Sequence, residues 1–202
     1  MASFPASRLT VEQYLEQEAK AQFRSEYFQG EVFAMTGNTR AHALLVTNLS
    51  GDLRDAMRRR DCRVYTTEIR LGIPDAQLYT YPDVLVTCGA EKMRGDASET
   101  VLNPVVIMEV LSPSTEAYDR GKKFELYRSI ASLQEYVLVA QDRVHVEQYL
   151  RQPNGSWLLN EYNAEDPGMT LSIGIELELA SVYEKVLESP PRLHRSMVRS
   201  MR

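Results

Sequence analysis

Two short apolar segments of the chain each carry one acidic residue, and this pattern constrains the fold more than any other feature. The first is residues 81–86 with Asp83, and the second is residues 105–111 with Glu109. Apolar runs of this length are typical of central strands that are buried on both faces of a sheet. An ionised carboxylate in such a strand is costly unless a cation or hydrogen-bond donors compensate it. One such residue fits a hydrogen-bonded structural acid, whereas two on strands that can be neighbours suggest a divalent-metal site.

The composition is that of an ordinary globular protein. The chain has 202 residues, of which 44% are hydrophobic and 25% are charged. We expect a single domain over residues 1–189, followed by a basic, disordered tail over residues 190–202. Because no apolar run approaches the ~20 residues of a membrane span, and the N-terminus lacks a basic-then-apolar signal pattern, we expect no membrane association.

The charge pattern limits the class of partner. The formal net charge is −5, so a nucleic-acid partner would need a local basic patch. A group of arginines near the end of the second predicted helix could supply such a patch, although a charged helix end is more often simply solvated. These are Arg54, Arg58, Arg59, Arg60 and Arg63.

The two cysteines show no metal-binding pattern. Cys62 and Cys88 have neither C-x-x-C spacing nor a nearby histidine pair. We therefore expect reduced thiols in a cytoplasmic protein, rather than a disulfide or a zinc site.

The order of the predicted elements indicates a single mixed α/β fold. Thr10 begins a capping box with Gln13 at the start of the first helix, and Leu9 is placed to pack on Tyr14. The four residues 112–115 end a strand and start a helix, with Ser114 or Thr115 as the N-cap. Helices are expected over about 10–20 and 40–60 and after 115, strands over 63–73, 81–87, 105–111 and 135–140, hairpins over 26–35 and 144–162, and a short amphipathic segment over 179–187.

The helix after Glu109 supplies a candidate catalytic lysine. Metal-assisted phosphodiester hydrolysis benefits from a lysine that positions water or stabilises developing charge. At about 100° per residue, Lys123 falls nearly opposite the polar face of this helix, in register with Asp119 and with Tyr127, which is most simply a core residue. A lysine that faces the sheet needs a partner, and the carboxylates of Asp83 and Glu109 are the nearest candidates. Alternatively, Lys123 reaches solvent or pairs with Asp119.

The combination of these segments resembles the PD-(D/E)XK nuclease superfamily, and more closely the Uma-type endonuclease family, a domain family of unknown function. The resemblance covers about residues 8–187. It is carried by Glu26-Tyr27-Phe28-Gln29-Gly30-Glu31, by His42, by Tyr81-Pro82-Asp83-Val84, by Glu109-Val110-Leu111-Ser112-Pro113-Ser114-Thr115, by Asp119-Arg120-Gly121-Lys122-Lys123 with Tyr127, and by Glu135-Tyr136-Val137-Leu138-Val139. It implies a restriction-endonuclease-like α/β core of order αβββαβ, in which helices flank a mixed sheet, with an N-terminal helix and hairpin and a C-terminal β-hairpin.

The resemblance also implies roles for individual residues. Asp83 and Glu109 would be ligands of Mg²⁺ or Mn²⁺, with the carbonyl of Val110 as a third ligand. The superfamily pattern places a lysine two residues after the glutamate, where this chain has Leu111. In the family this lysine is replaced by one from the following helix. The replacement maps onto Lys123, which would orient or activate the attacking water.

Two further residues are candidates for the site. His42 lies on a helix that borders the active site in this superfamily, yet a lone histidine on an apolar face is more often a hydrogen-bonded core residue. Glu26 opens the hairpin in a family-like motif and could approach the metal; otherwise it forms a salt bridge with a neighbour such as Arg24. Glu68 and Arg70 line the cleft or face water.

The leading hypothesis is therefore a metal-dependent endonuclease that hydrolyses DNA phosphodiester bonds as a homodimer, the dimer resting on the resemblance alone. The alternative is a catalytically inactive nuclease fold that serves as a nucleic-acid-binding or assembly module. A third hypothesis is a related hydrolase that acts on RNA or a nucleotide. Metal dependence separates the first two, because a binding module should be indifferent to the cation.

Overall fold

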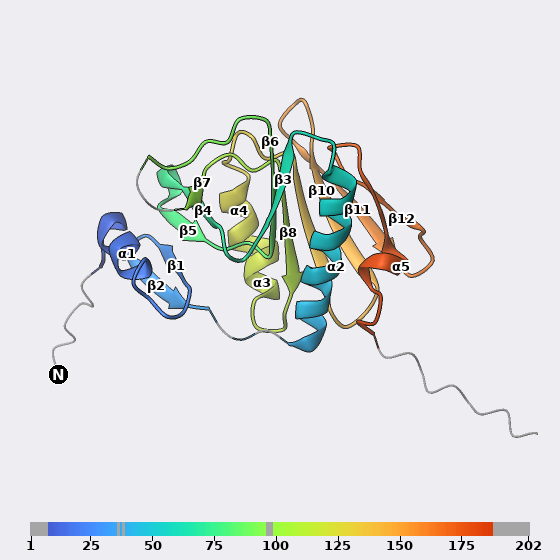
Figure 1. Cartoon of the computed structure of the whole chain (residues 1–202), viewed down its shortest axis with the longest axis horizontal. Helices are drawn as coiled ribbons and strands as arrows, with labels where there is room; N and C mark the ends of the chain where they lie inside the picture. The colour runs from blue at the N-terminus through green and yellow to red at the C-terminus, as the bar shows by residue number, and fades with distance from the viewer. Residues whose placement is uncertain (1–7, 36, 38, 96–98, 188–202) are drawn as a thin grey trace, which may run out of the picture.

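The computed structural model describes residues 8–35, 37, 39–95 and 99–187 of the chain (Figure 1). The expected disordered tail over residues 190–202 lies outside the described residues. Of the helices in this described part, none combines the length and the hydropathy that a transmembrane span requires. The helical elements are α1 (Val11–Glu18), α2 (Arg40–Met57), the 3₁₀ turn η1 (Pro74–Ala76), α3 (Glu116–Tyr118), the π-helical turn η2 (Asp119–Lys123), α4 (Phe124–Tyr127) and α5 (Leu179–Val182).

A six-stranded mixed sheet with the strand order β11-β10-β9-β8-β6-β3 forms the centre of the fold. Because β8 and β9 run parallel, they need a crossover, which α3, η2 and α4 provide; the other neighbouring pairs are antiparallel. The expected αβββαβ core with a C-terminal hairpin is therefore confirmed. The strands are β3 (Cys62–Thr66), β6 (Val84–Cys88), β8 (Val106–Leu111), β9 (Glu135–Ala140), β10 (His145–Arg151) and β11 (Trp157–Asn163).

A second, five-stranded sheet has the order β2-β1-β5-β4-β7 and contains the N-terminal hairpin. Figure 1 shows α1, β1 and β2 at one end of the molecule, and β10, β11, β12 and α5 at the other. The strands are β1 (Ser25–Phe28), β2 (Glu31–Ala34), β4 (Arg70–Ile73), β5 (Leu78–Thr80) and β7 (Thr100–Val101), and a third sheet pairs β12 (Gly168–Thr170) with β13 (Glu176–Glu178).

The predicted local signals at the N-terminus are confirmed. The Thr10 hydroxyl accepts the backbone N–H of Gln13, and the Gln13 side chain accepts that of Thr10, which completes the capping box. The hairpin turns at Gln29 and Gly30, whose φ angles are 48° and 94°. A Cβ on Gly30 would lie 2.6 Å from Cβ of Arg8, so the turn also needs glycine for its close packing against the chain that leads into α1.

Two apolar layers cover the two faces of the six-stranded sheet. Leu45, Leu49 and Leu53 of α2 pack on the face that contains Met108 and Val110. On the opposite face, the buried core includes α4 and alternate residues of β8 and β9. Because side chains alternate along a strand, Glu109 points to the face that the α3–η2–α4 segment covers. This placement brings the acid next to the helical segment that carries the predicted lysine.

One predicted strand is wrong in its extent. Residues 63–73 do not form a single strand; β3 and β4 belong to different sheets, and a turn in which the N–H of Ile69 donates to the carbonyl of Thr66 separates them. This turn, residues 66–69, contains no glycine or proline, and three of its four residues are β-branched, so it carries no local stop signal. Strands β5, β7, β12 and β13 were also not predicted.

The prediction of reduced thiols is wrong as well. Cys62 and Cys88 form a disulfide that joins β3 to β6, where the two residues lie directly opposite each other. The pairing follows from the register of two strands whose cysteines are 26 residues apart, and sequence spacing does not reveal this register. The disulfide removes the observation on which a cytoplasmic location was expected.

Candidate active site

A cavity of about 640 Å³ lies between the β1–β2 hairpin, the start of α2 and the connection from β8 to α3. The structure brings together at this cavity all five side chains that the sequence singled out. They are Glu26, His42, Asp83, Glu109 and Lys123. The cavity is therefore the candidate active site.

The two acids of the central strands converge as predicted. Asp83 directly precedes β6, and the pairing of Val84 with Met108 places it beside Glu109 on β8. The backbone N–H of Asp83 donates to Oε2 of Glu109 at 3.4 Å, and the N–H of Val110 donates to Oδ2 of Asp83 at 2.8 Å. Both carboxyl groups are buried. Backbone donors thus compensate part of the cost of burying them.

His42 is tied to this acid pair. Its Nε2 atom lies 3.0 Å from Oδ2 of Asp83, and the ring is buried at the first turn of α2, where Thr39 caps the helix by accepting the N–H of His42. The other ring nitrogen, Nδ1, is buried and has no hydrogen-bond partner within the described part of the chain. His42 is therefore a buried histidine that contacts a carboxylate of the cavity, as the core interpretation predicted, and its role in the chemistry stays a prediction.

Lys123 faces the same carboxylates. Its Nζ atom lies 2.9 Å from Oε1 of Glu109, 3.4 Å from Oδ1 of Asp119 and 3.6 Å from Oε1 of Glu26. The predicted contact with the strand acid and the alternative pairing with Asp119 thus occur together, and the prediction that Lys123 reaches solvent does not hold. Tyr127, predicted as a core residue, also donates its hydroxyl to Oε1 of Glu109 at 2.9 Å.

Glu26 approaches the site from the second sheet. Its carboxylate accepts the hydroxyl of Thr80 and faces Lys123, whereas Arg24 pairs with Glu68 at 3.0 Å. Neither Glu68 nor the buried Arg70 lines the cavity. Glu26 therefore lies at the cavity beside Lys123 and does not pair with Arg24, and Glu68 faces water, as one of its two interpretations predicted.

The electrostatics of the cluster favour a cation. Burial, assisted by the nearby charges of Asp83 and Asp119, raises the pKa of Glu109 to about 8 even though Lys123 acts in the opposite direction. Burial alone would lower the pKa of Lys123, but the surrounding carboxylates, Glu109 first, outweigh it and hold this pKa well above its usual range. Lys123 is therefore a permanent ammonium group, and the carboxyl groups around it still outnumber the positive charges.

A family model named Uma2, described as "Putative restriction endonuclease", matches residues 11–182. The chain belongs to the Uma2 family. The uncharacterized Synechocystis protein slr1290 is 35% identical over 90% of this chain and 94% of its own length. A second Synechocystis protein, sll1609, is 36% identical over 81% of this chain and 93% of its own length.

A solved structure shares the fold of this Uma2 member. The structure, described as "a putative nuclease belonging to DUF820" from Anabaena variabilis, superposes with a TM-score of 0.67 over 89% of this chain and 99% of the neighbour. The sequence identity is 16%, so the likeness establishes the shared fold and not the chemistry of the site.

The donor set of the site suits a hard divalent cation. Within the described residues, no group of three or more His, Cys, Asp or Glu side chains is arranged to hold a metal ion. The predicted ligand set asks for only two such side chains, Asp83 and Glu109, together with a backbone oxygen of Val110, which also lines the cavity. Mg²⁺ commonly binds through one or two carboxylates and keeps several waters, so these residues fit the ion that the nuclease-like fold implies.

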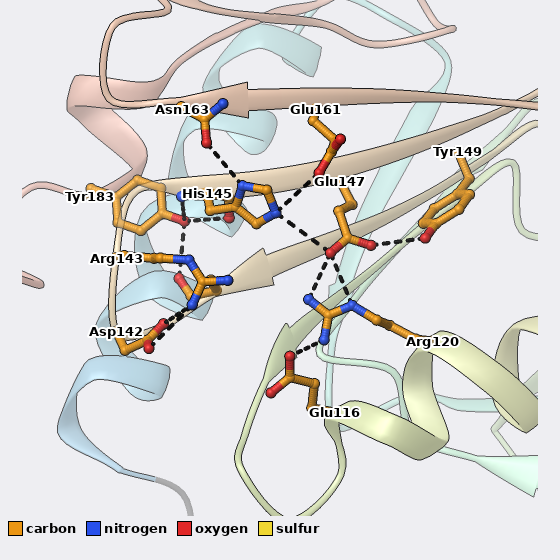
Figure 2. A network of polar contacts seen from close by, with 11 residues as sticks. Glu116, Arg120, Asp142, Arg143, His145, Glu147, Tyr149, Glu161, Asn163 and Tyr183 are labelled. Atoms are coloured by element: carbon orange, nitrogen blue, oxygen red, sulfur yellow. Dashed lines mark hydrogen bonds and ion pairs between the residues drawn. The ribbon is translucent and has the colours of Figure 1, made fainter.

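A polar network outside the cavity holds the lysine-bearing turn, and no sequence signal predicted it. Arg120 of η2 donates from Nε and Nη2 to Oε1 of Glu147 on β10, at 2.9 and 2.6 Å, and it also pairs with Glu116. Figure 2 shows Glu147 between Arg120 and the side chains of His145 and Tyr149. Because Arg120 lies three residues before Lys123, this contact fixes the π-helical turn against the sheet.

The remaining cavity wall is neutral, and sequence reasoning assigned it only a structural role. Thr115 is the N-cap residue of α3, but its side chain makes no capping bond; instead its hydroxyl and that of Ser114 hydrogen-bond to the hydroxyl of Ser112. These hydroxyl groups face the cavity together with aromatic side chains of the hairpin. The Ser-Pro-Ser-Thr segment thus lines the site as well as ending the strand.

Proposed function

We propose that this Uma2 member is a metal-dependent endonuclease that hydrolyses phosphodiester bonds of DNA with Mg²⁺ or Mn²⁺. The observation that carries the proposal is the convergence of Asp83 and Glu109 beside Lys123 at the wall of one cavity. Two buried acids and a buried lysine on different elements are costly to hold together, and a packed core alone does not require them.

In this proposal the carboxylates of Asp83 and Glu109 and the carbonyl of Val110 hold the ion. When bound, the ion polarises the phosphodiester and helps generate hydroxide. Lys123 acts as a hydrogen-bond donor that orients the attacking water and stabilises charge on the phosphate, because an ammonium group with a raised pKa is a poor base.

Two further side chains act by positioning. His42 holds the Oδ2 atom of Asp83, which leaves the other oxygen of this carboxylate for the ion. Glu26 faces the Lys123 ammonium from the hairpin and keeps it above the acid pair. Lys123 and Tyr127 both contact Oε1 of Glu109, so we expect the cation to compete with these two donors for this carboxylate.

The inactive-module alternative is favoured by one observation. Leu111 replaces the strand lysine of the superfamily pattern, and it is buried in an apolar cluster with Tyr127 and Leu138. Strand β8 therefore supplies no catalytic lysine, and activity depends entirely on Lys123. RNA as the substrate, a homodimeric state and a cytoplasmic location also stay predictions; sedimentation that finds only monomer at micromolar concentration would count against the dimer.

The decisive experiment is calorimetric titration of Mg²⁺ and Mn²⁺ into the wild type and the Asp83→Asn variant, paired with a plasmid-nicking assay. We expect binding and nicking in the wild type and the loss of both in the variant. Asp75→Asn, which removes an exposed acid in η1, is the matched control and should behave as the wild type. Metal binding without nicking would move the question to the substrate, and no binding at all would favour the inactive module.

A further inference from the structure

We infer that the cavity receives an unpaired nucleotide, so that the substrate is single-stranded or locally unpaired nucleic acid rather than an intact duplex. The inference rests on the proposed function and deepens it by naming the class of substrate. Three features of the cavity carry it: an aromatic face beside the acid pair, the scarcity of basic side chains at the wall, and the size of the space.

The aromatic face is formed by Phe28 and Phe33, and the register of the N-terminal hairpin places both rings beside Glu26. Phe33 of β2 lies directly opposite Glu26 of β1, so the two side chains share one face of the hairpin. Phe28 lies two residues after Glu26 and therefore points to the same face. Both rings line the cavity, and Glu26 lies 3.6 Å from the Lys123 ammonium. The rings thus stand next to the charged cluster.

Phe33 is unusually open to solvent for an aromatic side chain on a strand. It is 49% exposed although it lines a cavity, whereas Tyr27, which points to the other face of the same hairpin, is buried in an aromatic cluster with Tyr14 and Tyr79. The hairpin does not need Phe33 for its own core. An exposed ring next to a site is an available stacking surface, because every nucleic-acid base has a π-face.

The charge of the wall argues against a duplex. Double-stranded DNA is held mainly by rows of lysine and arginine on its phosphates. Among the described residues that line the cavity, Lys123 is the one lysine or arginine, and it is buried against carboxylates. Apart from the carboxylates, His42 and two tyrosines, the polar side chains on the wall are neutral Ser and Thr hydroxyls and an amide, which can contact a single phosphate without a row of charges. They are Thr39, Ser112, Ser114, Thr115 and Gln141.

The arginines near the end of α2 do not supply the missing row. Arg58 pairs with Asp55 at 2.8 Å, and Arg60 donates to the carbonyls of Ile173 and Gly174. These contacts within the chain engage two members of the predicted patch. The arginines of this patch also lie near the C-terminal end of α2, whereas His42, the residue of this helix that contacts the acid pair, lies in its first turn.

The volume of the cavity suits one nucleotide. A space of about 640 Å³ falls within the roughly 300–1,000 Å³ that is usual for small-ligand sites. A base inside a duplex is already stacked on its neighbours, so it must leave the stack before it can reach Phe28 and Phe33. A base packed on these rings would direct its phosphate toward Asp83 and Glu109. An unpaired strand meets this requirement without the cost of unstacking.

Binding, measured with Mg²⁺ present in the hydrolysis-deficient Lys123→Met background, in which the metal-binding carboxylates remain, tests the inference. The probes are a labelled single-stranded oligonucleotide and the blunt duplex of the same sequence, and the readout is fluorescence anisotropy. We expect the single strand to bind about ten-fold more tightly than the duplex. Phe33→Leu keeps an apolar side chain but loses the aromatic face, and it should weaken single-strand binding about five-fold or more, since stacking contributes about 1–3 kcal/mol per base.

Two variants are the controls. Phe33→Tyr keeps the ring and should bind within about two-fold of the parent. Val32→Ala changes the neighbouring exposed residue, which points to the other face of the hairpin, and should have no effect. Equal affinity for duplex and single strand, or equal effects of Phe33→Leu and Val32→Ala, would overturn the inference.

Hydrolysis assays distinguish failure of this inference from failure of the proposed function. Duplex nicking that Phe33→Leu leaves unchanged would support the endonuclease and overturn the unpaired-nucleotide site. Selective binding that depends on Phe33, without hydrolysis of either probe under Mg²⁺ or Mn²⁺, would support the nucleotide site and overturn the proposed hydrolysis.

Discussion

At the residue scale, Glu109 has the most unfavourable environment in the metal-free site. Its side chain is buried on a central strand, beside Asp83 and Asp119, and burial is the main cause of its raised pKa. A carboxyl group in this setting holds its proton to a higher pH than it does in the unfolded chain. The residue that is best placed to bind a cation is therefore also a source of instability when the cation is absent.

This environment predicts a pH dependence of the metal-free protein. The folded-state pKa of Glu109 is about 8, against an ordinary value of 4.5, so the folded state binds more protons between these values. In EDTA, the free energy of unfolding should fall as pH rises from 5 to 8, by at most about 1.4 kcal/mol per pH unit. Urea unfolding measures this slope. Glu109→Gln should flatten it and raise the melting temperature at pH 8, whereas the exposed-residue control Glu165→Gln should leave it unchanged.

Metal binding, measured as a function of pH and in the same variants, tests the assignment of the ligands. Mg²⁺ binding must displace the proton of Glu109, so the affinity for the ion should increase with pH up to about 8. Asp83→Asn should likewise raise the melting temperature without metal above pH 8, where Glu109 is ionised, because it removes one of two close negative charges. A metal-induced shift that survives unchanged in both Asp83→Asn and Glu109→Gln would contradict the site.

Lys123 gives a second prediction at this scale, with its neighbour as the control. Lys123→Met removes the buried ammonium and should lower kcat about 100-fold or more, since one donor to developing charge commonly contributes a factor of about 10²–10³. Metal binding should persist, because the carboxylates remain. Lys122→Met changes an exposed lysine that pairs with Glu125, and its kcat should match the wild type. Equal rates in the two variants would remove Lys123 from the mechanism.

At the element scale, the π-helical turn η2 depends on a partner far away in the sequence. Arg120 anchors it to Glu147 on β10 (Figure 2). Arg120→Met should cost about 1.5–3 kcal/mol of stability, the usual contribution of charged hydrogen bonds. It should also lower kcat with little change in metal affinity, because Lys123 loses its fixed position. The control Arg143→Met removes an arginine of the same region that pairs only with its neighbour Asp142 among the contacts drawn in Figure 2.

A charge reversal separates positioning from simple loss of stability. The double variant Arg120→Glu with Glu147→Arg restores the opposite charges and should recover part of the lost kcat, whereas either single change should not. If kcat in Arg120→Met equals that of the wild type at a temperature where both are folded, the anchor has no role in catalysis.

Short sequence patterns correctly predicted the elements whose formation depends on neighbouring residues in the chain. The capping box at Thr10 and the largely apolar strand that begins at Glu135 appear where the sequence placed them. The break between β3 and β4 was missed because it depends on which sheet each half joins, and not on a turn residue. The contact between Arg120 and Glu147 was missed for the same reason, since two residues 27 positions apart meet only through the register of β8, β9 and β10.

The site was predicted to a different extent from the fold. Asp83 and Glu109 stood out because a charged residue in an apolar strand is physically anomalous. The placement of Lys123 followed from helical periodicity, which holds approximately even though the segment contains a π-helical turn. The aromatic face at Phe33 carried no such anomaly. A phenylalanine on a predicted strand is ordinary, and only the register opposite Glu26 places it at the cavity.

At the scale of the whole molecule, the disulfide and the candidate site lie at opposite ends of β6. Cys88 ends this strand and Asp83 precedes it, so about 16 Å of extended chain separates them. The disulfide should therefore support the sheet edge at β3 without shaping the cavity.

Reduction, or the double variant Cys62→Ser with Cys88→Ser, should lower the free energy of unfolding by about 2–4 kcal/mol and leave kcat within two-fold at 25 °C. Melting curves and nicking rates with and without dithiothreitol measure both quantities, and the double variant, which has no bond to reduce, controls for other effects of the reductant. Loss of nicking on reduction, while the protein stays folded, would instead mean that the sheet edge at β3 transmits its state along β6 to the acid pair.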